Sequence, residues 1–184
     1  MVTPLLSAIQ TAGRYLATDH AVWRWRSYEL PLEIQSFVSS HLPDMSYVTS
    51  VRGILLRDHE VLLLANGDGI QHVIPGGRID PGESALETLK REIGEETGWT
   101  FVQPEMLGVM YLRHLAPCPP GYPYPHPEFL QVVYTLRAET CKPESKLDND
   151  YEQAIRFVSI DEALALPIAE GQKAYLTHIR TGWR

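Results

Sequence analysis

The sequence predicts an α/β fold in which a mixed sheet is covered by helices on both faces. Two observations support this prediction. Segments with strand-like alternation lie before and after one amphipathic helix at 84–97, and a second helical pattern closes the chain at 171–183. A chain of 184 residues can bury roughly 70% of its unfolded surface, so one domain with an extension is expected. We place the extension at 1–45 and the domain at 46–184.

The strands are predicted from apolar runs bounded by turn residues. A hairpin-like pair at 47–57 and 60–66 is joined by a turn at Asp58 and His59. The strands expected after this pair are 72–75, 101–115, 128–139 and 156–160.

The first 45 residues contain two segments that we interpret as helices. Their apolar residues are Leu5, Ile9, Tyr15 and Leu16 in the first segment, and Leu32, Ile34, Phe37 and Val38 in the second. A helical N-terminal extension is therefore expected, as a homodimer surface, a lid or a further cover for the sheet. The WRWR stretch at 23–26 alternates aromatic and basic residues, but on an acidic chain packing is favoured over nucleic-acid binding.

Charge and cysteine usage exclude several classes of protein. The net charge of -7 argues against binding to duplex nucleic acid or an anionic membrane surface. No stretch approaches the roughly 18 apolar residues of a membrane span. Cys118 and Cys141 have no CxxC neighbour and no disulfide framework, which fits a reducing compartment, so the cytoplasm is expected.

The central helix has clear signals at both ends. Ser84 and Glu87 form a capping box, and Gly98 can supply the left-handed residue that ends the helix. Between them, an apolar stripe is predicted to face the core, formed by Ala85, Leu86, Leu89 and Ile93.

Three carboxylates crowd onto one flank of this helix. Glu92, Glu95 and Glu96 are neighbours at helical spacing and repel one another by a few tenths of a kcal/mol per pair. A bound divalent cation would turn this repulsion into attraction. Carboxylate oxygens suit Mg²⁺ or Mn²⁺, and no Cys/His set for zinc is present.

The segment 77–99 resembles the signature of the Nudix hydrolases, G-x5-E-x7-R-E-U-x-E-E-x-G-U with U a bulky apolar residue. The matching residues are Gly77, Glu83, Arg91, Glu92, Ile93, Glu95, Glu96, Gly98 and Trp99. The resemblance implies an α/β/α sandwich over about 46–184. It also implies that Glu92, Glu95 and Glu96 bind the metal, with the backbone carbonyl of Gly77 as a further ligand.

The resemblance implies roles for further residues. Glu83 and Arg91 are expected to pair and to hold the loop against the helix. The general base is drawn either from the helix, as Glu95 or Glu92, or from the loop before the last strand, where Glu152 is the candidate. Asp148 and Asp150 are acidic neighbours of Glu152.

The substrate is less well defined by the sequence. Fifteen positions after the signature stands His114 rather than a proline, so no subclass marker fits. The stretch PCPPGYPYPHP at 117–127 has six prolines in eleven residues. It could present Tyr122, Tyr124 and His126 as a rigid platform for a base, or be a stiff connection between strands. Candidate phosphate contacts are Arg52, Arg78 and Arg113.

Three functions fit these residues. The favoured one is metal-dependent hydrolysis of a phosphoanhydride bond in a nucleotide or a small nucleoside diphosphate-linked compound, by an activated water. A Nudix-fold isoprenoid diphosphate isomerase is an alternative, but no motif places Cys118 or Cys141 in an active site. A nucleotide-sensing domain without catalysis is the other, but such domains typically lose signature glutamates that this chain keeps.

Overall fold

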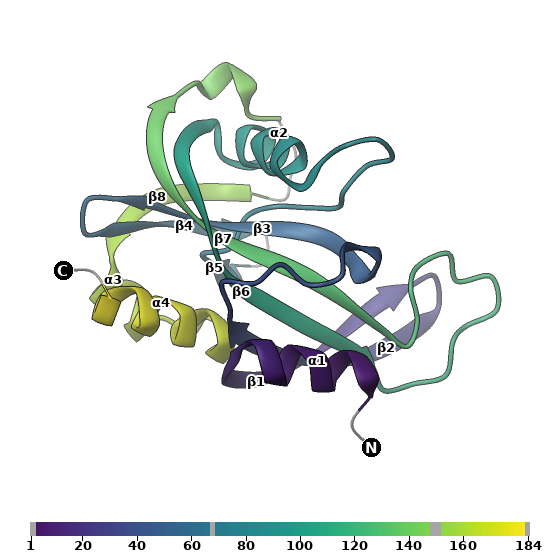
Figure 1. Cartoon of the computed structure of the whole chain (residues 1–184). Coiled ribbons are helices and arrows are strands. Elements are labelled where there is room, and N and C mark those ends of the chain that lie inside the picture. Colours follow the sequence, from purple (N-terminus) through teal and green to yellow (C-terminus); the bar gives the residue numbers. More distant parts are fainter. Residues whose placement is uncertain (1–2, 67–68, 148–151, 183–184) are drawn as a thin grey trace.

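The strands form one curled mixed sheet. The structure, a computed structural model, describes residues 3–66, 69–147 and 152–182, and these form eight strands in the order β1-β2-β6-β7-β3-β4-β5, with β8 paired to β4 (Figure 1). The pair β3 and β7 is parallel and the other pairs are antiparallel. The strands are β1 Arg14–Trp25, β2 Tyr28–Val38, β3 Val48–Arg57, β4 Glu60–Asn66, β5 Gln71–His72, β6 Trp99–His114, β7 Glu128–Cys141 and β8 Glu152–Ser159.

Four α-helices and two short 3-10 helices are described. Their bounds are α1 Pro4–Ala12, η1 Met45–Tyr47, α2 Ala85–Thr97, η2 Pro143–Ser145, α3 Ile160–Ala165 and α4 Glu170–Gly182. The closing helix predicted from the sequence is confirmed as α4. None of the helices in the described ranges combines the length and apolar character needed to cross a bilayer.

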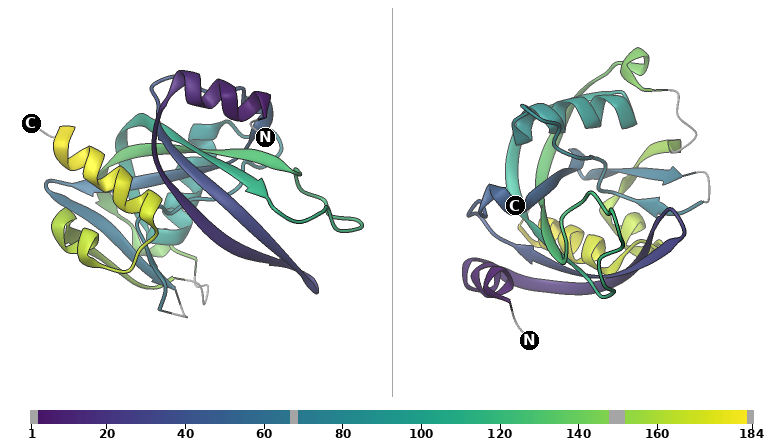
Figure 2. Two further views of the ribbon diagram at one scale, coloured as in Figure 1. Left: turned by 90° about the horizontal axis from the view of Figure 1, so that it is seen from below. Right: turned by 90° about the vertical axis from the view of Figure 1, so that its right-hand side faces the viewer.

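Helices cover the sheet on both faces. In Figures 1 and 2, α2 lies on one side of β3 and β4, and α3 with α4 lies on the other. Leu89 and Ile93 of α2 belong to one apolar cluster, whereas Tyr175 and Leu176 of α4 belong to another. Since side chains alternate along a strand, β3 contributes to both clusters. The predicted mixed sheet with two helical layers is confirmed.

The helical prediction for the N-terminal extension is correct only for its beginning. Helix α1 ends at Ala12, with Gly13 as its C-cap, so Tyr15 and Leu16 lie in β1 instead. Leu5, Leu6 and Ile9 of α1 pack into the same apolar cluster as α2.

The second predicted N-terminal helix is wrong. Residues 32–38 belong to β2, which forms a hairpin with β1 and then hydrogen bonds to β6 from Leu32 opposite His114 to Val38 opposite Gly108. The strand signal was the spacing of two between Leu30, Leu32 and Ile34, of which the first two are fully buried. Pairing with β6 decides the conformation here, because strand preference depends on tertiary context.

Candidate active site

The loop before α2 runs along β3 as an extra strand-like segment. Val51 N donates a hydrogen bond to Gly77 O (2.9 Å), and Gly53 N donates one to Pro75 O (2.9 Å). Gly76 has φ of 134°, a conformation that favours glycine, and its N–H donates to Glu96 Oε2 at 2.7 Å. The loop is therefore fixed between the sheet and the acidic flank of α2.

Gly77 packs directly against the Glu92 carboxylate. A Cβ on Gly77 would overlap both oxygens of Glu92, so any larger residue here would displace that carboxylate. The Gly77 carbonyl accepts one hydrogen bond, from Val51 N, and keeps a second lone pair.

Helix α2 has the predicted ends. Ser84 Oγ accepts from Glu87 N and the Glu87 carboxylate accepts from Ser84 N, which completes the capping box. Gly98 is left-handed, with φ of 72°. The predicted apolar stripe is correct for Leu89 and Ile93, which are fully buried, but wrong for Leu86, which is 42% exposed.

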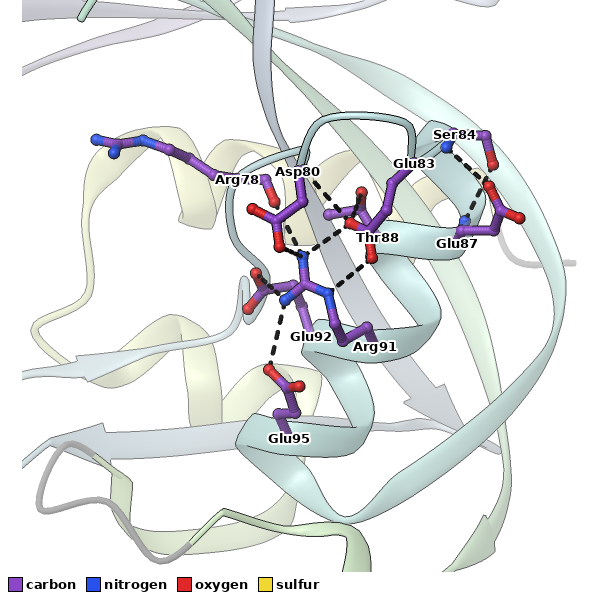
Figure 3. A network of polar contacts seen from close by, with 9 residues as sticks. All are labelled: Arg78, Asp80, Glu83, Ser84, Glu87, Thr88, Arg91, Glu92 and Glu95. Atoms are coloured by element: carbon purple, nitrogen blue, oxygen red, sulfur yellow. Dashed lines mark hydrogen bonds and ion pairs between the residues drawn. The ribbon is translucent and has the colours of Figure 1, made fainter. Parts of the chain in front are cut away.

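Arg91 is the centre of the polar network drawn in Figure 3. Its Nε and Nη2 donate to the two oxygens of Glu83, both at 2.9 Å, which confirms that these residues pair. Its Nη1 donates to Glu92 Oε1 at 2.8 Å and to Glu95 Oε2 at 3.4 Å. Its Nη2 also donates to the backbone carbonyl of Arg78 at 3.2 Å. One guanidinium thus links the loop, Glu83 and two of the signature glutamates.

The charges of this network are mutually stabilised. The hydrogen bonds from Arg91 and then from Thr88 lower the pKa of Glu83 to about 2. The bond to Glu83 is the main cause that raises the pKa of Arg91 above its ordinary value. Glu83 is therefore ionised at every pH at which the protein is expected to work.

The residues around Gly77 fit a divalent cation in donor type. Glu92, Glu95 and Glu96 offer carboxylate oxygens and Gly77 a carbonyl, the donors that Mg²⁺ and Mn²⁺ prefer. Within the described residues, no three His, Cys, Asp or Glu side chains stand at the spacing of a bound ion. Instead, Arg91 contacts Glu92 and Glu95, and Gly76 N contacts Glu96.

Arg52 of β3 connects the loop to two adjoining cavities. Its Nη1 donates to the carbonyl of Gly76, and its Nε donates to Gln131 Oε1 at 3.3 Å. Burial lowers the pKa of Arg52, and the charges of Glu96 and Glu92 oppose that effect. The guanidinium remains protonated, since its ordinary pKa is far above neutrality.

The two cavities share Trp23, Arg52 and Gln131. The narrow cavity has a volume of about 100 Å³ and is lined by Trp23, Thr49, Ser50, Arg52, Arg78, Tyr122, Tyr124, Pro125, Phe129 and Gln131. The wide cavity, of about 470 Å³, extends toward the start of α4, where its wall includes Asp19, His20, His72, Gln172 and Tyr175. We call these two adjoining cavities the cleft; Arg52, which lines both, donates to the carbonyl of Gly76.

Four of the predicted substrate contacts line the narrow cavity: Arg52, Arg78, Tyr122 and Tyr124. His126 does not line either cavity; its ring stacks on His114 at 4.9 Å, and its Nε2 donates to Ala116 O. Arg113 also lies outside both cavities, paired with Glu33 at 3.1 Å. These two residues are therefore not brought to the cleft.

Two cleft residues were missed in the sequence. Gln131 is 4% exposed and is a lone polar residue in the apolar run of β7, a pattern that could have signalled a buried polar role. Trp23 belongs to the WRWR stretch, and strand alternation would have placed it on the same face as Trp25.

The candidate base Glu152 is described in part. Its backbone begins β8 and pairs with Asn66, whereas its side chain, like Asp148 and Asp150, lies outside the described residues. Its role as a base stays a prediction.

The chain belongs to the Nudix hydrolase family, because the family model for the NUDIX domain matches residues 46–179. The resemblance drawn from the signature is thereby confirmed, as is the expected class of enzyme, a Nudix pyrophosphohydrolase.

Two curated relatives illustrate the range of the family. The asymmetrical bis(5'-nucleosyl)-tetraphosphatase of Rattus norvegicus is 36% identical over 120 residues, which cover 64% of this chain and 76% of that protein. A putative 8-oxo-dGTP diphosphatase of Bacillus subtilis is 43% identical over 56 residues, which cover 30% of this chain and 38% of that protein.

Two solved structures share the fold. The pyrophosphohydrolase RppH of Bacillus subtilis superimposes with a TM-score of 0.56 at 17% identity, covering 89% of this chain and 98% of that chain. The NUDIX domain of NrtR from Shewanella oneidensis, crystallised with ADP-ribose, gives a TM-score of 0.55 at 18% identity and covers 74% and 88%.

Proposed function

We propose that this protein hydrolyses a phosphoanhydride bond in a nucleotide or a small nucleoside diphosphate-linked compound, with Mg²⁺ as its cofactor and Mn²⁺ as a substitute. The supporting observation is the position of Arg52. It donates to the Gly76 loop, which the acidic flank of α2 also contacts, and it lines both cavities of the cleft. A diphosphate beside Arg52 would therefore lie next to the carboxylates, with its organic group in the cleft.

The residues of the signature divide into groups with different roles in this proposal. Glu92, Glu95, Glu96 and the Gly77 carbonyl would hold the ion. When bound, the ion would neutralise the phosphate charge and lower the pKa of a water that attacks phosphorus. Arg91 and Glu83 keep the helix and loop in register, and Arg52 and Arg78 bind phosphate oxygens. Glu95, Glu92 or Glu152 takes the proton from the attacking water.

The name of one relative indicates which substrates to test first. The rat relative is named for cleavage of a bis-nucleosyl tetraphosphate, and 76% of its length is covered. Dinucleoside polyphosphates therefore belong in any substrate panel, beside nucleoside triphosphates, ADP-ribose and nucleotide sugars. A cytoplasmic location is part of the same proposal.

The two alternative functions have less support. An isomerase would need a cysteine in the cleft, but Cys118 and Cys141 are exposed and line neither cavity. A sensing domain without catalysis is expected to lack signature glutamates, all of which are present.

The test is product analysis with the full panel in Mg²⁺. Wild type is compared with Glu96→Gln and with Glu139→Gln, a matched control at a surface glutamate on β7. We expect phosphate or pyrophosphate release from at least one compound, loss of release in Glu96→Gln, and no change in Glu139→Gln. Isotopically labelled water identifies the phosphorus atom that is attacked. Tight binding of one compound with no release from any would reject hydrolysis in favour of sensing.

A further inference from the structure

The N-terminal hairpin places an aromatic side chain in the cleft. Trp23 of β1 lines both cavities and packs against Phe129 of β7, with ring centroids 5.8 Å apart. It lies outside residues 46–179, the part of the chain that the family model matches. This wall of the cleft is thus supplied by a segment outside the family match.

The hairpin is held firmly in this position. Strand β2 hydrogen bonds to β6 from Leu32 to Val38. On β1, the strand that carries Trp23, the two oxygens of Asp19 accept hydrogen bonds from Glu170 N (2.9 Å) and Gly171 N (2.8 Å) at the start of α4. Trp23 is therefore a preorganised wall, which reduces the ordering entropy lost on ligand binding.

Two further aromatic side chains, Tyr122 and Tyr124, line the narrow cavity. The guanidinium of Arg78 lies over the Tyr124 ring, 3.6 Å from its centroid. The Tyr124 ring packs edge-on against Tyr122, with ring centroids 5.3 Å apart. Tyr122 in turn packs edge-on against Trp25 of the hairpin, at 5.4 Å. A cavity of about 100 Å³, some three water volumes, holds a ring rather than a whole nucleotide.

Gln131 gives this cavity a polar group with unused donors. Its Oε1 accepts from Arg52 Nε, which fixes the orientation of the amide. Within the described part of the chain, its Nε2 donates no hydrogen bond, although the residue is 4% exposed. Nε2 is not among the buried side-chain atoms of the described residues that lack a partner, so it is open to the cavity and can donate to an acceptor on a ligand.

We propose that the narrow cavity binds the planar heteroaromatic ring of the substrate, with Trp23 as stacking wall and Gln131 as donor to a ring acceptor. The inference rests on the proposed function for the identity of the phosphate-bearing half of the ligand. In this proposal, the N-terminal hairpin selects the base, whereas the residues of α2 serve the hydrolysis.

The test is calorimetric binding of non-hydrolysable α,β-methylene diphosphate nucleotides, one for each of adenine, guanine, uracil and cytosine, compared with methylenediphosphonate, which has no base. The variants are Trp23→Leu, Trp23→Phe and Gln131→Met. Tyr28→Leu is the matched control, since Tyr28 lies on the same hairpin, is 43% exposed and lines neither cavity. Melting curves and circular dichroism first establish that each variant is folded.

We expect wild type to bind at least one nucleotide more tightly than methylenediphosphonate. Trp23→Leu should weaken binding of that nucleotide by about tenfold or more and leave binding of methylenediphosphonate unchanged. Gln131→Met should weaken binding of the nucleotide by about tenfold more than binding of methylenediphosphonate, because Arg52 also loses an acceptor in this variant. Trp23→Phe should recover most of the loss, and Tyr28→Leu should behave as wild type.

Equal losses for both kinds of ligand, no loss at all, or a wild type that does not prefer any nucleotide would overturn the inference. Because binding is measured without turnover, these results are separable from hydrolysis. If the base preference depends on Trp23 but no product is released, the proposed function is rejected and the assignment of the narrow cavity stands. If product is released but Trp23→Leu has no effect on the base preference, the proposed function stands and the assignment of the narrow cavity is rejected.

Discussion

Arg78 joins Tyr124 to Arg91 through two different parts of the same residue. Its guanidinium lies 3.6 Å from the Tyr124 ring centroid, and its backbone carbonyl accepts a hydrogen bond from Arg91 Nη2 at 3.2 Å. The loop that positions the signature glutamates is thus in direct contact with the wall of the narrow cavity. Tyr124 is therefore separated by one residue, Arg78, from Arg91, which donates to Glu92 and Glu95.

Arg91→Gln should lower kcat far more than it lowers thermal stability. The substitution removes the bonds to Glu83, Glu92 and Glu95 together, so the signature glutamates lose their orientation. The Arg91 side chain is 28% exposed, so solvent screens part of its bidentate pair with Glu83, and we expect Tm to fall by a few degrees. Arg57→Gln, which breaks the exposed pair with Glu60, is the control. Losses of activity and stability in proportion would contradict an orienting role.

Stability should fall in acid because of Glu83. Its pKa is about 2 in the folded protein and about 4.5 when unfolded, so the unfolded chain takes up this proton first as pH falls. The stabilisation is complete above pH 4.5 and is lost as the pH approaches 2. Asp44 and Glu87 also have lowered pKa values, so wild type is compared with Glu83→Gln by melting curves across this window. The wild-type slope should be the steeper one, and identical slopes would refute the assignment.

Gly77→Ala should abolish most activity, because the added methyl overlaps the Glu92 carboxylate. Displacement of a ligand by about 1 Å can lower kcat by about 100-fold. Gly94→Ala is the matched control, since nothing lies within 4 Å of the added methyl. Alanine is the better helix former by about 1 kcal/mol, so Gly94→Ala should raise Tm by about 3 °C with unchanged kcat. Full activity in Gly77→Ala would show that the close approach has no function.

Glu152→Gln and Glu95→Gln separate the two sources of the general base. A positioned base contributes about 100-fold or more to kcat, and the variant that loses this amount with unchanged Kd values for both nucleotide and Mn²⁺ identifies it, since loss of a metal ligand would weaken Mn²⁺ binding. Glu144→Gln, at an exposed glutamate of η2, is the control. A fall of less than tenfold in Glu152→Gln would remove that residue from the mechanism.

The sequence predicts the site best where its contacts are local. The capping box, the Gly98 end and the Arg91–Glu83 pair all fall within 77–99, so spacing alone is informative. The cleft depends on distant partners instead. Leu32 meets His114 across the sheet, and Asp19 meets Gly171, pairings that residue spacing does not encode. Spacing alone therefore predicts a helix at 32–38, where β2 lies, and does not identify Trp23 as a cleft residue.

The covering of β6 by β2 has a practical consequence for truncation. A fragment beginning at residue 46, where the family match starts, would leave Gly108–His114 of β6 as an open sheet edge. Long unpaired edges recruit other strands, so such a fragment is expected to self-associate. It would also lack Trp23. An expression boundary chosen by family match alone is therefore expected to yield a self-associating fragment whose cleft lacks one wall, so its behaviour would not represent the intact chain.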